Sequence, residues 1–285
     1  SYTDIYQQLA ENPAYTVNTY PCLNALNEPL WPDRWNYEAL MARKAEVGSM
    51  MFTREYMCVP ISTGTSLFNP EHLDNAKNKD LVLKPLKREG YKYFVGVDPA
   101  ISTDGDYNVI TVIEMDEEEN KSVVYVDRSK NVEFRENIQK VKLIGQLFRP
   151  EAILFETNTF AKSFTQELRQ VADLNIHDFN TTRRKKQEVI LNLQMTLENN
   201  KMNFPYGNEE SRRVTSALIE ELSMFAITER GKFEGVGAHD DMVMSLALAN
   251  AATYQATDNF ILLDDMGIFD DKPKASASFG LGLNF

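Results

Sequence analysis

The order of apolar segments between about residue 90 and residue 256 constrains the fold of this 285-residue chain most strongly. Apolar strand patterns at 91–98, 109–115 and 122–127 are separated by turns that carry Asp, Gly, Glu and Asn, which predicts an antiparallel meander. Helices and short strands then alternate to the end of this region. Three antiparallel strands followed by strand–helix alternation predict an α/β fold with a mixed central β-sheet flanked by helices.

The segments after the meander are assigned from their periodicity and their end signals. A helix at 134–148 is expected to end before Pro150 and to bury an apolar stripe made of Ile138, Val141, Leu143, Ile144 and Leu147. The other expected elements are helices at 160–173, 182–200, 209–225 and 240–254, strands at 152–156, 175–179 and 202–205, and a hairpin at 225–235. A further helix is expected at 37–48, in a first region rich in Asn, Pro and aromatic residues.

Composition narrows the class of protein. The formal net charge of −12 disfavours a passive nucleic-acid coat, yet it allows an enzyme whose carboxylates gather around cations. The two cysteines and three scattered histidines form neither a disulfide framework nor a zinc pattern, which fits a reducing cytosol. No apolar run reaches the roughly 18 residues of a membrane span, and the polar N-terminus has no signal-peptide pattern.

Acidic residues stand at the ends of three apolar segments. Asp98 ends the first strand of the meander, and Glu156 ends the strand "AILFE". Asp240 and Asp241 open the last core helix. If the strands that end at Asp98 and Glu156 are parallel neighbours, both side chains emerge at the sheet edge where sites of α/β folds lie. A helix start placed over that edge adds a further carboxylate.

Carboxylates that converge in this way repel one another at neutral pH unless cations neutralise them. Their hard oxygen atoms suit Mg²⁺ or Mn²⁺. Two such ions, roughly 3.5–4 Å apart, activate a water and stabilise the leaving oxygen in phosphodiester hydrolysis. The sequence therefore predicts a metal-binding and catalytic set made of Asp98, Glu156, Asp240 and Asp241, in which Asp98 bridges the two ions.

Each of these acids also has a structural interpretation. Asp98 precedes Pro99 and fits a turn, and Glu156 fits a cap of the next helix. An acid at 240 or 241 fits a helix N-cap or first turn. Adjacent helical side chains point about 100° apart, so the two aspartates are expected to differ in role, with Asp241 favoured as the direct metal ligand.

Other polar residues are candidates for support and for substrate binding. Asp106 and His239 are expected to support the metal ligands, although Asp106 also fits a turn and His239 a structural hydrogen bond. A basic cluster opens the helix at 182–200, where it opposes the helix dipole. Phosphate contact is its functional interpretation and a solvated face its structural one, and its members are Arg183, Arg184, Lys185 and Lys186.

Three stretches in order, "FVGVDPA", "AILFETN" and "GAHDDMVMSLALA", resemble the nuclease domain of the large terminase subunit of tailed bacteriophages. The segment "LWPDRWNYEALMARKAEVGSMMFTREYMCVPISTGTSLF" is similar to the part of that family that joins a motor ATPase to its nuclease. The resemblance covers roughly residues 28–254. It is most specific in the Trp-Pro stretch "LWPDRW" and in the "HDD" helix.

The resemblance implies an RNase H-like fold and a two-metal endonuclease that cuts concatemeric double-stranded viral DNA during genome packaging. By motif position, Asp98, Glu156 and Asp240/Asp241 are the metal-binding acids, for Mg²⁺ or Mn²⁺. The implied partners are double-stranded DNA, the portal protein and the small terminase subunit, without a membrane. The implied location is the host cytoplasm, transiently at the procapsid portal vertex.

The sequence departs from the full-length family in one respect. It contains no G-x-x-x-x-G-K-[ST] phosphate loop, so ATP is expected only at a motor domain that this chain lacks. Residues 1–85 are then interpreted as the connector from the motor side, residues 86–256 as the nuclease domain and residues 257–285 as an acidic, then Ser/Ala/Gly-containing tail that is mobile or bound to a partner.

Two other functions remain open at this stage. The chain could be a different RNase H-like nuclease, such as a junction resolvase or transposase, although the connector-like segment disfavours this. Alternatively, it could be a non-catalytic docking module of a packaging motor, in which the acids serve as caps. Substrate preference separates the first alternative from a terminase nuclease, and stabilisation by divalent ions separates the second.

Overall fold

The computed structural model describes residues 12–59, 66–84, 86–99, 107–157, 165–169, 174–228, 232–235 and 239–255. Its helices are α2 (Tyr37–Val47), α3 (Ser49–Glu55), α4 (Pro70–Asn75), α5 (Phe134–Phe148), α7 (Arg183–Glu198), α8 (Glu209–Ser223) and α9 (Asp241–Gln255). Its strands are β1 (Lys77–Asn78), β2 (Lys92–Asp98), β3 (Asn108–Met115), β4 (Lys121–Ser129), β5 (Ala152–Glu156), β6 (Ile176–Phe179), β7 (Met202–Pro205), β8 (Phe225–Ile227) and β9 (Phe233–Gly235).

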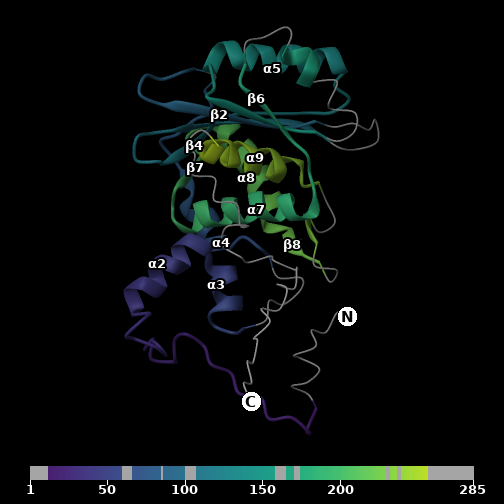
Figure 1. Cartoon of the computed structure of the whole chain (residues 1–285). Coiled ribbons are helices and arrows are strands. Elements are labelled where there is room, and N and C mark those ends of the chain that lie inside the picture. The colour runs from purple at the N-terminus through teal and green to yellow at the C-terminus, as the bar shows by residue number, and fades with distance from the viewer. Residues whose placement is uncertain are drawn as a thin grey trace, which may run out of the picture.

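One mixed sheet of seven strands organises the chain, in the order β1-β7-β4-β3-β2-β5-β6. Strands β2, β3 and β4 form the predicted antiparallel meander. Strands β5 and β6 continue from β2 in parallel, while β7 pairs in parallel with β4. Helices lie on both sides of the sheet (Figure 1). The predicted α/β fold with a mixed, helix-flanked sheet is therefore confirmed.

The two faces of the sheet have different coverings. Helix α5 lies over one face, whereas α9 lies directly under the other, with α8 and α7 beyond it (Figure 1). Along β2 the side chains alternate: Tyr93, Val95 and Val97 pack in the cluster that includes α5, and Phe94 packs in the cluster that includes α9. Each face thus has its own apolar core, and a residue's parity in β2 decides which core it enters.

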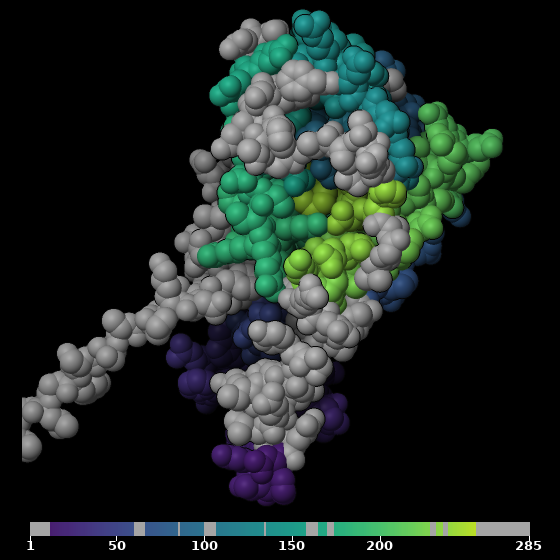
Figure 2. All heavy atoms as spheres, turned by 90° about the vertical axis from the view of Figure 1, so that its right-hand side faces the viewer, coloured from purple at the N-terminus to yellow at the C-terminus, as the bar shows by residue number. Residues whose placement is uncertain are grey.

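Helix α9 is buried on all sides. Residues 242–253 are all buried, which is typical of a helix enclosed within a core. The sheet covers one side of this helix, and α7 and α8 contact others. In the space-filling view of Figure 2, the green atoms of α7 lie against the yellow-green atoms of the segment that includes β8 and α9. The start of α9 is therefore held between the sheet and α7.

The predicted apolar stripe of α5 was wrong in two of its members. Ile138, Val141 and Ile144 are buried as predicted, but Leu143 is 55% exposed and Leu147 is 41% exposed. Both lie on the opposite side of the helix, because Leu143 and Leu147 follow Val141 by two and six residues, which correspond to rotations of about 200° and about 240°. Apolar character alone had placed them in a stripe that helical geometry does not permit.

The other predicted elements match the structure within two residues at each end, except the helix at 160–173. Of that helix only residues 165–169 are described, and they are helical. Residues 66–78 also contribute to the structure around the sheet, since β1 pairs with β7 and Phe68 packs on Phe225. The division of the chain at 85/86 and 256/257 stays a prediction, and the tail lies outside the described residues. In the described part of the chain, no helix is both long and apolar enough to cross a membrane.

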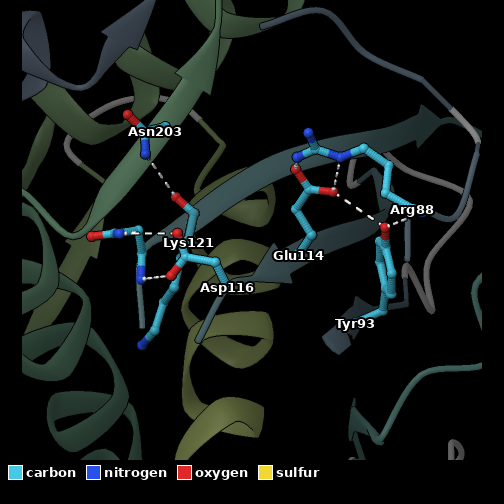
Figure 3. Close-up of polar contacts among 7 residues, drawn as sticks. Arg88, Tyr93, Glu114, Asp116, Lys121 and Asn203 are labelled. Atoms are coloured by element: carbon cyan, nitrogen blue, oxygen red, sulfur yellow. Dashed lines mark hydrogen bonds and ion pairs between the residues drawn. The ribbon is translucent and has the colours of Figure 1, made fainter. Parts of the chain in front are cut away.

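A buried polar network supports the far end of the meander (Figure 3). The carboxylate of Glu114 is buried and forms an ion pair with the Arg88 guanidinium. The Tyr93 hydroxyl donates to Glu114 at 3.2 Å and accepts from the backbone N–H of Arg88 at 2.7 Å. In the neighbouring turn, Asp116 accepts a hydrogen bond from the side chain of Asn120 at 2.9 Å. These contacts join β2, β3 and the segment that enters the sheet.

Candidate metal centre

The ends of β2 and β5 bring two of the predicted acids together. The parallel register pairs Val97 with Phe155, so its next step sets Asp98 beside Glu156. Both acids follow the parity of residues that face α9, such as Phe94 in β2 and Leu154 in β5. The strands therefore direct both carboxylates to the face of the sheet that α9 covers. The condition stated from the sequence, that these strands are parallel neighbours, is met.

A close crossing of α9 over β2 adds the helix start. Gly96 has no side chain, and a Cβ built on it would lie only 2.0 Å from the carbonyl oxygen of Ser245. The Ser245 hydroxyl donates to the carbonyl oxygen of Gly96 at 3.0 Å. Asp241 precedes Ser245 by four helical residues, about 6.0 Å, and Asp98 follows Gly96 by two strand residues, about 6.6 Å. The crossing thus places the first residue of α9 near the end of β2.

The assembled acids perturb one another's charge. The pKa of Asp98 lies well above its usual range, first because the surroundings desolvate its carboxyl and next because of the charges of Glu156 and Asp241. A hydrogen bond with Glu156 and the charge of Asp240 raise it further. A hydrogen bond between two carboxyl groups requires that one of them is protonated. Burial and the neighbouring charges therefore both disfavour the ionised form of Asp98.

The two adjacent aspartates have different partners. Asp240 accepts a hydrogen bond from the Lys186 ammonium of α7, at 2.8 Å. Asp241 accepts from the backbone N–H of Tyr107 at 3.2 Å, and His239 Nδ1 lies 3.5 Å from the same carboxylate. The ring of His239 meets that of Tyr107 edge-on. Asp106, the other predicted supporting residue, lies outside the described residues.

Three residues that the sequence did not reveal frame the start of α9. Glu221 of α8 accepts a hydrogen bond from the backbone N–H of Met242 at 2.9 Å and forms an ion pair with Arg128 at 2.7 Å. The Arg128 guanidinium in turn lies 3.9 Å from the centre of the Tyr107 ring. Burial raises the pKa of Glu221 to about 7, although Arg128 and the Met242 N–H oppose the shift. No local motif marks these residues, because their partners lie far away in the sequence.

The basic cluster lies at the start of α7, whose first turn is capped by the Thr182 side chain. Its members have unequal partners. Arg184 pairs with Glu188 at 3.1 Å, Lys185 lies over the Phe179 ring, and Lys186 reaches Asp240. The cluster is thus joined to the acids through Lys186 and Asp240, and atoms of α7 are visible on the face shown in Figure 2.

The acids fit a hard divalent cation by their chemistry. All four donors are carboxylates, and the pKa of Asp98 is raised first by burial and then by neighbouring negative charges that a cation would neutralise. Among the described residues, however, no group of three or more His, Cys, Asp or Glu side chains stands ready to hold an ion. The carboxylates of the cluster contact other side chains instead: Asp98 forms a hydrogen bond with Glu156, and Asp240 forms an ion pair with Lys186. Ion binding would require these partners to be exchanged.

A mixed sheet with parallel strands on both sides of an antiparallel meander, and with acids gathered at one edge under a buried helix, fits an RNase H-like domain. The chain belongs to the terminase family of such domains: the family model described as "Terminase RNaseH-like domain" matches residues 95–252. The resemblance to the large terminase subunit noted from the sequence is therefore confirmed. The match begins in β2 and ends in α9, so it includes the strands and helix that carry the acids.

The chain is also similar to solved structures. The large terminase nuclease from thermophilic phage G20c with bound magnesium is 20% identical, with a TM-score of 0.50 over 67% of this chain and 98% of that one. The nuclease domain of the Thermus phage P74-26 large terminase is 20% identical (TM-score 0.46; 63% and 92% covered). The HK97 bacteriophage large terminase is 10% identical (TM-score 0.48; 75% and 50% covered). No curated protein matches the sequence.

Proposed function

We propose that this chain is a metal-dependent endonuclease that cuts concatemeric double-stranded viral DNA during genome packaging. One observation carries the proposal: the parallel ends of β2 and β5 set Asp98 beside Glu156 at the start of α9, where burial first, and then the charges of Glu156, Asp241 and Asp240, raise the pKa of Asp98 well above its usual range. Clustered acids of this kind are costly for stability and are typical of functional sites. Membership of the terminase family and the magnesium-bound structure of a protein with the same fold support the metal-dependent chemistry.

The residues of the chain have distinct tasks in this mechanism. Two divalent cations held by the carboxylates, Mg²⁺ or Mn²⁺, would supply activation of the attacking water and neutralisation of the leaving oxygen. Asp98, which both Glu156 and Asp241 influence, is the residue we assign to both ions. The N–H of Tyr107 orients Asp241, and His239 lies beside the same carboxylate. No residue forms a covalent bond to DNA, and the products are 5′-phosphate and 3′-hydroxyl ends.

Substrate binding is assigned to the basic start of α7. Arg183, Arg184, Lys185 and Lys186 would contact phosphates, which gives affinity without sequence preference. The portal protein, the small terminase subunit and a location at the procapsid portal vertex in the host cytoplasm belong to the same proposal. ATP hydrolysis is assigned to a separate motor domain, because this chain has no phosphate loop.

Plasmid cleavage tests the proposal. Supercoiled plasmid is incubated with the wild-type chain, with Asp98→Asn and with the control Asp33→Asn, in Mn²⁺ and in Mg²⁺. The control removes the same charge from an exposed position in the segment before α2, outside the sheet that carries the cluster. We expect metal-dependent nicking and linearisation by the wild type and the control, and none by Asp98→Asn with an intact circular dichroism spectrum.

Thermal stability provides a second readout. Divalent cations should raise the melting temperature of the wild type, since they bind the native state alone, and should not do so for Asp98→Asn. Without added cation, Asp98→Asn should be more stable than the wild type because it relieves repulsion within the cluster. Cleavage that survives in Asp98→Asn would refute the assigned site. Absence of both cleavage and stabilisation in the wild type would favour a docking module, and preference for branched junctions would favour a resolvase.

A further inference from the structure

The ion pair between Lys186 and Asp240 joins the basic cluster to the acid cluster. The Lys186 Nζ atom donates to Asp240 Oδ2 at 2.8 Å, across a separation of 54 residues in sequence. Both side chains are largely enclosed, with exposures of 23% for Lys186 and 28% for Asp240. The pair is therefore set by the tertiary structure and not by neighbouring positions on one helix.

The surroundings hold Lys186 at this position. Its backbone N–H donates to the carbonyl oxygen of Thr182 at 2.9 Å within the first turn of α7. Its ammonium also lies 5.7 Å from the centre of the Phe225 ring. A cation in the first turn of a helix is unfavourable next to the positive end of the dipole, and Asp240 offsets this cost. Lys186 is thus placed where a negative partner is required.

Lys186 and a divalent cation would both bind the carboxylate of Asp240. Both need the carboxylate oxygen, and two cations within contact distance repel each other. We propose that Lys186 is an internal counter-ion that competes with the divalent cation for Asp240, so that metal binding and release of the lysine are coupled. This inference rests on the proposed metal-dependent function and adds a residue that sets metal affinity.

The competition gives Lys186 two successive partners. While its ammonium neutralises Asp240, the acid cluster is less repulsive and α7 is fixed to the start of α9. When a divalent cation takes Asp240, the ammonium is released at the edge of the site and becomes available to the phosphate of a bound DNA strand. The phosphate contact predicted for Lys186 then belongs to the metal-bound state, whereas the ion pair with Asp240 belongs to the metal-free state.

Manganese binding to the chain tests the inference without measuring cleavage. Mn²⁺ is titrated into wild type, Lys186→Met and the control Lys185→Met at fixed pH and salt, and free Mn²⁺ is followed by its electron paramagnetic resonance signal. Methionine keeps an apolar stem against Phe225 but removes the charge. Lys185 is one residue away and exposed, and its ring partner is Phe179. Lys186→Gln is a second variant in case the first folds poorly.

We expect Lys186→Met and Lys186→Gln to bind Mn²⁺ about two- to five-fold more tightly than the wild type, the range that a partly exposed ion pair corresponds to. Lys185→Met should bind with wild-type affinity. In an Asp240→Asn background the Lys186→Met change should have no effect, because the competed oxygen is gone. Equal or weaker Mn²⁺ binding by both Lys186 variants would overturn the inference and leave the proposed function intact. Absence of Mn²⁺ binding in every protein would overturn both.

Discussion

Replacing Gly96 with alanine should separate α9 from β2 and disturb both the core and the acid cluster. The added Cβ would lie 2.0 Å from the carbonyl oxygen of Ser245 and 2.4 Å from the backbone nitrogen of Ala249. Both contacts are backbone atoms, which no side-chain rotation can move. Ordinary contact begins at 3.4 Å, so the helix and strand must separate by about 1.4 Å, the difference from 2.0 Å.

Overpacking of a core typically costs about 1–3 kcal/mol, and a rigid backbone contact places Gly96→Ala at about 3 kcal/mol. For a protein of this size that corresponds to a fall of about 6–12 °C in melting temperature. Because the same displacement carries Asp241 away from Asp98, cleavage should fall about 10²-fold at a temperature where the variant is folded.

Thermal denaturation and plasmid cleavage measure these two effects. Gly145→Ala in α5 is the matched control, since its Cβ would meet only the end of the Leu174 side chain, at 2.4 Å, and that side chain can rotate away. We expect the control to lose less than half as much stability and no activity. A Gly96→Ala protein with wild-type melting temperature and wild-type cleavage would refute the close crossing of α9 over β2.

Two further predictions concern charged residues away from the site. Lys121 is 4% exposed, and burial lowers its pKa to about 7, although its Nζ donates to Asn250 Oδ1 at 2.9 Å. The unfolded chain then holds one more proton than the folded chain above pH 7, so the free energy of unfolding should rise by about 1.4 kcal/mol per pH unit between pH 7.5 and 9. In urea titrations Lys121→Met should lack this component, and equal slopes in both proteins would contradict a neutral buried lysine. Arg88→Met should lower the free energy of unfolding by about 1–3 kcal/mol in the same assay, because it leaves the buried Glu114 carboxylate with only the Tyr93 hydroxyl as a partner. The control Arg54→Met removes a surface ion pair and should change the free energy of unfolding by less than about 1 kcal/mol.

The sequence was sufficient to predict the sheet and the ends of its strands, because these depend on short-range patterns. Nearly continuous apolar runs mark β2, β3 and β5, since strands of a sheet covered on both faces are buried on both sides. Acids at the ends of such segments could be assigned to one edge once a parallel pairing was assumed. The error at Leu143 and Leu147 came from counting apolar residues without following their angles around the helix.

The parts that the sequence did not reveal depend on contacts between distant residues. The pairing of Lys186 with Asp240 requires the relative placement of α7 and α9, which local propensity does not encode. Glu221 has the same character, since it belongs to α8 but bonds to the start of α9. A buried glutamate on the apolar side of an amphipathic helix was the one available signal, and it does not identify the partner.

The acid cluster and the hydrophobic core share one structural element, and this connects function to stability. Helix α9 is covered by the sheet on one side and contacts α7 and α8 on others. Its first residue is Asp241. Moving that carboxylate therefore requires moving a helix whose residues are buried along most of its length. In contrast, the Lys186 side chain is long, unbranched and 23% exposed, so its ammonium can leave Asp240 without repacking the core. A rigid set of acids with a movable internal cation is the arrangement in which metal affinity can change through one side chain while the fold stays fixed.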